Sequence, residues 1–262
     1  MTRTLAALAL AVLTPLACER ATPYASLRIV EGPGSDGRAL ALDQPLRVEF
    51  DRPLPAAMRA GAFAILDAAG APREAASHEV AGRYLMIHPR LPRRPDLSDG
   101  TLRPGAHYRL ILRGVPHLVA VRSPEGAALI GDRVLEFETL PRDDPAALVG
   151  GVPSRDGLRL LLPGGGIPPL AVVGGDGMVE LPLSGPLDPR TLLAPARLLQ
   201  PGGGAVEAPL ELAVNSAAGS LLRVHVPQWG PGAVLELPEG LEGPGGVRLS
   251  AAMRRIRLRG AP

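Results

Sequence analysis

The chain has 262 residues, of which 32 are Gly and 30 are Pro, a density that excludes long helices and favours short strands joined by turns. The 28 basic residues, all Arg, nearly balance the 26 acidic ones, and the two signs are interspersed, which argues against a nucleic-acid-binding protein. Aromatic residues make up only 3% of the chain, so Leu, Val, Ile and Ala must fill the core.

Residues 1–17 have the pattern of a secretory signal, with one positive charge, the apolar run 5–13 and small residues after it. The run is too short to cross a bilayer, which takes about 20 residues. Cys18, the only cysteine, follows Leu16 and Ala17 and resembles the acceptor cysteine of a bacterial lipoprotein signal. Ordinary signal cleavage that leaves a free thiol is the alternative. The resemblance implies lipidation of Cys18.

The chain then repeats itself in six patches that occur in the same order in both halves. The matched ranges are 26–34 with 157–165, 46–50 with 177–181, 52–54 with 185–187, 83–89 with 220–226, 103–110 with 230–237, and 133–140 with 253–260. The offset begins at 131 residues, which is the size of a domain rather than of a stacked repeat. We therefore expect two tandem domains, 24–140 and 157–260, joined by a linker at 141–156 that is rich in Pro, Gly and Asp.

Each half shows the alternation of apolar and polar residues that is typical of strands with one buried face. Ranges 46–50, 108–112 and 134–140 alternate with a period of two. Such segments recur at short intervals between Pro and Gly turns, which predicts an all-β chain of antiparallel β-sandwiches. Only 54–66 and 188–199 have helical character, and each predicts a single turn.

The first half also carries a set of spaced motifs. Its motif residues are Phe50, Pro53, Leu54, Pro104, Gly105, Tyr108 and Phe137. Together they resemble the bacterial Ig-like domain first described in S-layer proteins. The second half keeps Pro186, Pro231 and Gly232, but Leu181, Leu235 and Leu258 replace the aromatic residues, so we expect a divergent copy. The resemblance implies an extracytoplasmic spacer, adhesion or accessory module without shared catalytic residues.

The motif residues have structural rather than chemical roles. Pro104 fixes φ and Gly105 permits a positive φ, which predicts a turn before the next strand, and Pro231 with Gly232 predicts the same turn. We expect Tyr108 to bury its ring and to find a partner for its hydroxyl, as in a tyrosine corner. Pro186 and its counterpart Pro53 would end a strand, where a missing N–H costs little.

Sequence patterns that carry chemistry are weak in this chain. The glycine pattern at 32–37 precedes a strand-like stretch and not the helix that a dinucleotide site needs. The five histidines lack metal-ligand spacing. The basic stretch 88–96 predicts an exposed loop, with an anionic glycan contact as the alternative. We expect no catalytic residue, cofactor or metal, and the chain is not expected to be an enzyme.

The sequence therefore predicts a non-enzymatic lipoprotein of the cell envelope that is attached to the membrane through its N-terminal lipid. Glu19 follows the cysteine. In the bacterial sorting pattern that this sequence resembles, Asp at this position retains a lipoprotein in the inner membrane, so its absence favours the outer membrane. The expected function is that of a structural, spacer or surface module. The alternative is an adhesion or accessory module that binds a glycan or an envelope protein on its loops or edge strands.

Overall fold

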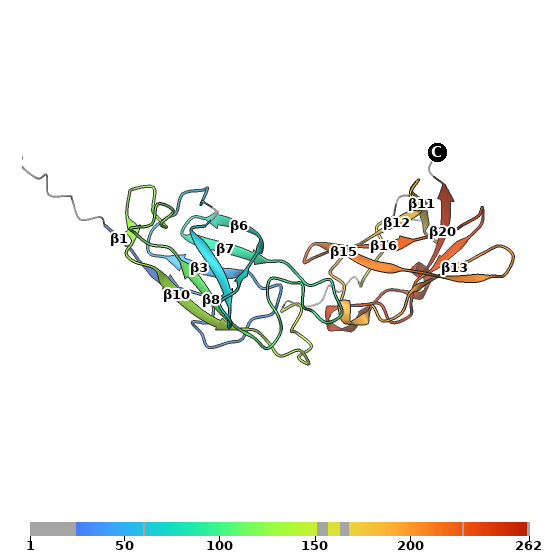
Figure 1. Ribbon diagram of the computed structural model, residues 1–262, viewed down its shortest axis with the longest axis horizontal. Coiled ribbons are helices and arrows are strands. Elements are labelled where there is room, and N and C mark those ends of the chain that lie inside the picture. Colours follow the sequence, from blue (N-terminus) through green and yellow to red (C-terminus); the bar gives the residue numbers. More distant parts are fainter. Residues whose placement is uncertain (1–24, 60, 151–156, 163–167, 227, 261–262) are drawn as a thin grey trace, which may run out of the picture.

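The computed structural model describes residues 25–59, 61–150, 157–162, 168–226 and 228–260. These residues form two hydrophobic cores, one in the first sandwich (25–150) and one in the second sandwich (157–260). Figure 1 shows the two sandwiches end to end. No helix in these ranges has the length and apolarity that would let it span a membrane. The expected leader and Cys18 lie outside the described residues.

The first sandwich consists of two four-stranded sheets that face each other. One sheet has the order β2 (Ile29–Glu31), β3 (Leu46–Phe50), β7 (Tyr84–Pro89) and β6 (Ala75–Ala81). The other has the order β10 (Arg133–Glu138), β8 (His107–Leu112), β4 (Phe63–Asp67) and β5 (Pro72–Arg73). The short strand β1 (Ser26–Leu27) pairs in parallel with β9 (Ala128–Leu129) at the end of the molecule that is farthest from the second sandwich (Figure 1).

Apart from its first strand, β11, the second sandwich repeats this strand order. One half of its sheet is β11 (Leu170–Val173), β12 (Met178–Leu183), β16 (Gly219–His225) and β15 (Leu210–Ser216), and the other half is β20 (Arg255–Gly260), β17 (Val234–Glu236), β13 (Ala196–Leu199) and β14 (Ala205–Ala208). Because β11 pairs with both β12 and β20, the two halves join into one eight-stranded ladder. A small hairpin of β18 (Glu242–Gly243) and β19 (Val247–Arg248), and the short 3-10 helices η1 (Pro189–Thr191), η2 (Pro244–Gly246) and η3 (Ala251–Met253), complete it.

Long-range pairings show that the two sandwiches are structural copies. Leu27 pairs in parallel with Leu129, and Leu158 pairs in parallel with Leu249. The chain then crosses to the opposite sheet in both halves, where Leu40 pairs with Thr139 and Ala171 pairs with Leu258. Leu27 and Leu158, like Leu40 and Ala171, stand 131 residues apart, so the sequence offset at the start of the repeat corresponds to the structure.

Two of the expected equivalences shift by two residues. Phe50 pairs with Ile29, and the matching bridge in the second half joins Leu160 to Leu183, so Leu183 and not Leu181 takes the place of Phe50. In the same way, Phe137 pairs with Tyr108 and Ile256 pairs with Leu235, so Ile256 and not Leu258 is the counterpart of Phe137. A slip of two keeps each side chain on the same face of a strand, and the alternating pattern therefore cannot detect it.

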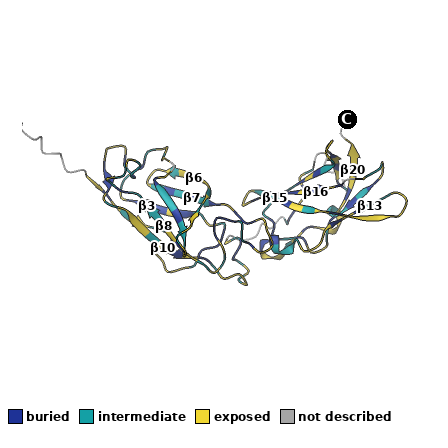
Figure 2. Cartoon of the chain, viewed as in Figure 1, coloured by how far each residue is buried: buried dark blue, intermediate teal, exposed yellow. Residues whose placement is uncertain are grey.

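Alternation along the strands builds both cores. Leu46 and Val48 of β3 are buried, as are Val179 and Leu181 of β12, and burial of one such side chain stabilises the fold by about 1.5–3 kcal/mol. Figure 2 shows the buried residues along the facing strands of both sandwiches. The first core contains few aromatic residues. The ring of Tyr108 stacks on that of Phe137, with 5.5 Å between the ring centroids.

The two segments of expected helical character differ. In 54–66 no helix forms, because Phe63 and the residues after it enter β4 and pair with β8. In 188–199 the single turn is present as η1, where the carboxylate of Asp188 accepts a hydrogen bond from the backbone N–H of Arg190. Strand pairing thus overrides local helical preference in the first half.

The end of the described part of the expected linker, residues 147–150, is held by the first sandwich. Leu148 is completely buried in its core, and the backbone N–H of Leu42 donates to the carbonyl of Ala147 over 2.8 Å. The N–H of Gly150 donates to the carboxylate of Asp43 over 2.9 Å. Burial raises the pKa of Asp43 and outweighs the hydrogen bond from Gly150, which lowers it. The first sandwich therefore continues to Gly150, while 151–156 lie outside the described residues.

Candidate functional site

The contact between the two sandwiches, which we call the junction, is made by side chains that hydrogen-bond to the main chain of the other sandwich. Asn215 near the end of β15 is 94% buried, and its side chain is fully engaged. Its amide nitrogen donates to the carbonyl of Leu187 over 3.0 Å and to the carbonyl of Pro92, in the first sandwich, over 2.9 Å. Its amide oxygen accepts from the N–H of Leu187 over 3.1 Å. A buried amide with these partners fixes the position of the loop that it contacts.

Arg93 makes a second contact next to Asn215. Its guanidinium donates over 3.1 Å to the carbonyl of Ala213. The ladder between β15 and β16 shifts register between Leu212 and Val214, so Ala213 stands at a β-bulge. A bulge releases a residue from regular pairing, which leaves the Ala213 carbonyl available to the first sandwich.

Asp99 holds the loop that presents these contacts. Its carboxylate accepts from the N–H of Arg93 over 2.9 Å and from the N–H of Arg94 over 3.0 Å, and it forms an ion pair of 3.3 Å with the guanidinium of Arg93. Partial burial acts to raise the pKa of Asp99, but these hydrogen bonds and the positive charge of Arg93 outweigh it and lower the pKa below its usual range. The loop is therefore organised around an ionised carboxylate.

Arg190 of η1 reaches across the junction from the second sandwich. One guanidinium nitrogen donates to the carbonyl of Arg142 over 2.6 Å. The others form a two-pronged pair with Asp188, at 2.9 Å and 2.7 Å. This hydrogen-bonded pair raises the pKa of Arg190. The geometry is that of the stronger class of arginine–carboxylate contacts, and it holds η1 against the first sandwich.

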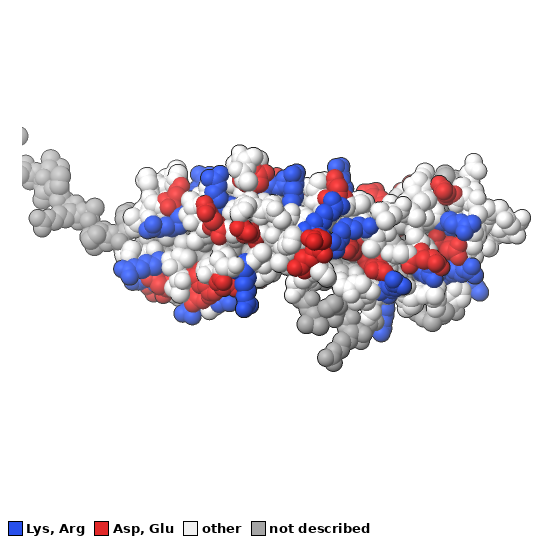
Figure 3. All heavy atoms as spheres, turned by 90° about the horizontal axis from the view of Figure 1, so that it is seen from below, with Lys and Arg blue, Asp and Glu red and all other residues white. Residues whose placement is uncertain are grey.

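The junction also encloses a hollow of about 310 Å³ between Arg93, Asp99 and the apolar residues Leu192, Leu210 and Leu212. Figure 3 shows that basic and acidic side chains lie close together near the middle of the molecule. The charges there are largely used on one another. The contacts of this site are suited to positioning two sandwiches.

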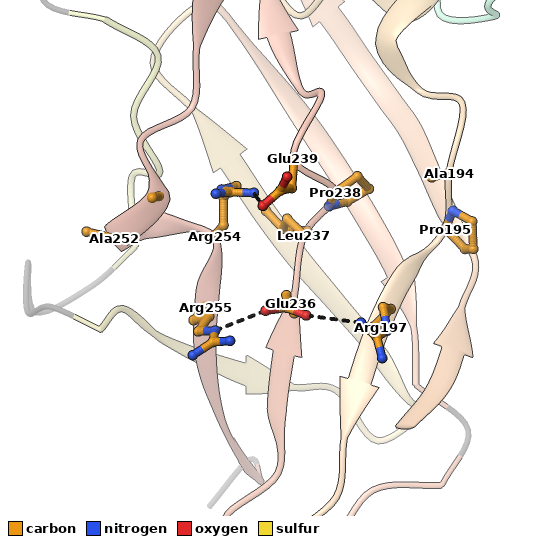
Figure 4. A pocket seen from close by; sticks show the side chains of 11 residues that line it. Ala194, Pro195, Arg197, Glu236, Leu237, Pro238, Glu239, Ala252, Arg254 and Arg255 are labelled. Atoms are coloured by element: carbon orange, nitrogen blue, oxygen red, sulfur yellow. Dashed lines mark hydrogen bonds and ion pairs between the residues drawn. The ribbon is translucent and has the colours of Figure 1, made fainter. Parts of the chain in front are cut away.

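A hollow of about 670 Å³ lies in the second sandwich between β13, β17 and η3 (Figure 4). Glu236 stands between Arg197 and Arg255, with ion pairs of 3.7 Å and 2.9 Å, and Arg254 pairs with Glu239 at 3.0 Å. The buried Nε of Arg254 has no hydrogen-bond partner. Three arginines and two glutamates leave little net charge, so the hollow has no marked electrostatic preference.

The motif residues of the sequence lie in structural positions. Gly105 and Gly232 have φ values of 63° and 86°, the conformation expected from the two Pro-Gly pairs. Tyr108 is 2% exposed, and its hydroxyl accepts from the N–H of Arg103 over 2.6 Å. Phe50 and Leu54 are buried, and the N–H of Leu54 donates to the carbonyl of Gly82 just after Pro53. Pro186 and Pro231 lie in the loops before η1 and β17. The motif thus marks turns and core, and not the junction.

Histidines and carboxylates pair singly in this structure. His88, His107 and His117 lie within 3.3 Å of Glu79, Glu138 and Asp132 respectively. No group of three or more possible metal ligands occurs among the residues described. The basic stretch 88–96 is only partly the exposed loop that the sequence predicted, because His88 and Pro89 end β7 and the side chains of Leu91 and Pro92 are buried. The stretch supplies Pro92 and Arg93 to the junction with the second sandwich.

Sequence reasoning did not identify the junction residues. Asn215 and Asp99 are single polar residues without a motif, and their partners lie far away in the sequence. The cluster of arginines at 88–96 marks the stretch that supplies Arg93 to the junction, but it gives no indication of the partner in the second sandwich.

Neither a protein-family model nor a curated protein sequence matches the chain. Among solved structures, the chain is similar to the N-terminal part of the bacterial S-layer protein SbsC, with 13% identity and a TM-score of 0.32, over 90% of this chain and 44% of that one. It is also similar to the I9–I11 tandem of titin (8%, TM-score 0.22, 90% and 66%) and to the FN1–FN3 domains of chicken CNTN1 (11%, 0.20, 92% and 67%). The chain spans less than half of the SbsC structure.

Proposed function

We propose that this protein is a non-enzymatic lipoprotein of the cell envelope whose two Ig-like sandwiches act as a spacer. The observation that carries the proposal is the junction, in which the buried amide of Asn215 and the guanidinium of Arg93 each donate to a main-chain carbonyl of the other sandwich. A spacer must keep a defined length, and a junction with several directional hydrogen bonds, one of them buried, restricts bending more than a free linker does.

The anchor is the second part of the proposal. Cys18 is the only cysteine and follows an apolar run of signal-peptide length. Lipidation accounts for both its position and its solitude, since an exported protein rarely keeps a single free thiol. Glu19 in place of Asp supports the outer membrane as the destination.

The anchor is tested by expressing the full chain in a bacterial host with a labelled fatty acid. The unaltered chain should carry the label and fractionate with membranes, while Cys18→Ser should carry none. Thr14→Ser, a conservative change in the same leader, is the control and should be labelled normally. Equal labelling of the unaltered chain and Cys18→Ser would contradict the proposal.

A further inference from the structure

The repeat allows the outer end of the first sandwich, which faces away from the second, to be compared with the equivalent end of the second sandwich. The loops 184–195 and 237–254 of the second sandwich correspond to the loops 51–62 and 113–132 of the first, because they connect equivalent strands. In the second sandwich this end contacts the first through Arg190. In the first sandwich the same end, which we call the N-terminal pole (51–62, 113–132 and β1), faces away from the second sandwich, and no other sandwich of the described residues covers it (Figure 1). A surface that contacts a neighbouring sandwich in one copy thus has no sandwich partner in the other among the residues that the structure describes.

The N-terminal pole presents apolar side chains to solvent. Leu118 is 93% exposed in the long loop between β8 and β10. Ile130 of the same loop, and Val134 at the start of the adjoining β10, are about half exposed. Two hollows open next to them. One, of about 350 Å³, lies between 55–62 and 118–122, and the other, of about 530 Å³, lies between β1, β2 and the start of β10. Several exposed apolar residues next to hollows, rather than a single exposed Leu, form a surface that an apolar partner can cover.

The charges of the pole suit a phosphate-bearing surface. Arg28 and Arg133 line one hollow, and Arg59 and Arg122 line the other. Two carboxylates of the long loop are engaged within the sandwich, since Glu125 pairs with Arg52 at 3.5 Å and Asp132 pairs with His117 at 3.2 Å. Arginine is well suited to contact phosphate groups, and apolar residues flanked by Arg are the composition of a membrane-surface contact.

The path of the chain selects the occupant. Ser26, the first residue of β1, stands eight positions after Cys18. Even a fully extended chain advances only ~3.5 Å per residue, so the pole lies within ~28 Å of an anchor at Cys18. We propose that the N-terminal pole rests on the bilayer that anchors the chain, with Leu118 in the headgroup region. This inference depends on the membrane anchor of the proposed function and adds an orientation to it.

The test uses a tether that does not require natural lipidation. The mature chain carries Cys18→Ser and an N-terminal histidine tag, and it is bound to vesicles of phosphatidylcholine and phosphatidylglycerol that contain a nickel-chelating lipid. An environment-sensitive dye is attached at Leu118→Cys, which is then the only cysteine. The matched control carries the dye at Leu193→Cys, a leucine of the second sandwich that is 82% exposed.

On binding to vesicles, the dye at Leu118→Cys should shift to the blue, gain about two-fold or more in intensity and be quenched by a lipid-borne nitroxide. The dye at Leu193→Cys should do none of these. Equal behaviour at both positions would overturn the inference. A change at Leu118→Cys that rises with protein concentration without vesicles would overturn it in favour of a second copy of the chain. Fatty-acid labelling of Cys18 is measured separately, so failure of the anchor and failure of the orientation can be distinguished.

Discussion

The side-chain amide of Asn215 donates to the carbonyl of Pro92, 123 positions earlier in the chain, over 2.9 Å. The same amide also satisfies both backbone groups of Leu187. One buried side chain therefore links the internal structure of the second sandwich to its contact with the first. Removing it should affect both properties together, and a merely structural residue of one sandwich should affect only one.

Asn215→Ala should destabilise the second sandwich by about 1–3 kcal/mol, because it leaves buried backbone groups without partners. It should also loosen the junction. Denaturant unfolding of the full chain measures the first effect, as a lower midpoint for the second sandwich. Ser216→Ala is the neighbouring exposed control and should stay within about 0.5 kcal/mol. An Asn215→Ala chain as stable as the unaltered one would show that the bond is not significant.

Acid should loosen the junction loop through Asp99. The pKa of this group is lowered in the folded state, so its ionised form stabilises the fold. That contribution is present above the unfolded pKa of about 3.9 and is lost as the pH falls through the lower folded value. Asp99→Asn should therefore reduce stability near neutral pH and matter little at a pH below both values. Chemical unfolding at the two pH values measures this, and an unchanged difference between the chains would contradict it.

Gly105→Val and Gly232→Val should each destabilise their own sandwich by about 1 kcal/mol or more, because both glycines have positive φ. Space is not the obstacle, since an added Cβ would meet its nearest neighbour at 3.7 Å and 3.6 Å. Gly202→Ala, without positive φ or close neighbours, is the control. If Gly232→Val is neutral while Gly105→Val is costly, the second turn is not equivalent to the first.

Leu148→Ala should destabilise the first sandwich by about 2–5 kcal/mol, as expected for a large buried side chain replaced by a small one. The measurement is unfolding of a fragment that ends at residue 150, compared with the same fragment carrying Leu118→Ala. The latter change removes an exposed leucine and should be nearly neutral. A neutral Leu148→Ala would mean that 141–150 act as a linker after all.

Local patterns predicted a large part of this fold. Alternation in 46–50 and 108–112 identified buried faces, and the Pro-Gly pairs identified turns with positive φ, because both depend on neighbouring residues. The two-residue register at Leu183 and Ile256 was not predicted, since such a slip leaves the faces unchanged. It is set by pairing partners more than 20 residues away in the sequence.

The junction was beyond local patterns for a similar reason. Arg93 belongs to a basic stretch that reads as an exposed loop, and its acceptor becomes accessible only through the bulge at Ala213. Leu148 was hidden within a stretch rich in Pro, Gly and Asp, although the residues 146–149 are apolar. The contacts of polar residues with distant partners can be recognised only in the folded structure. The same holds for the burial of short apolar runs in loops.

The distance between the two sandwiches tests the spacer most directly. Spin labels at Ala68→Cys, in the turn between β4 and β5, and at Ala205→Cys, on β14, report it in a Cys18→Ser chain by pulsed electron paramagnetic resonance. Both positions are exposed. The account predicts one narrow distance distribution, which Asn215→Ala should broaden. A broad distribution in the chain with Asn215 intact would contradict it, because the sandwiches would then move freely and could not set a length.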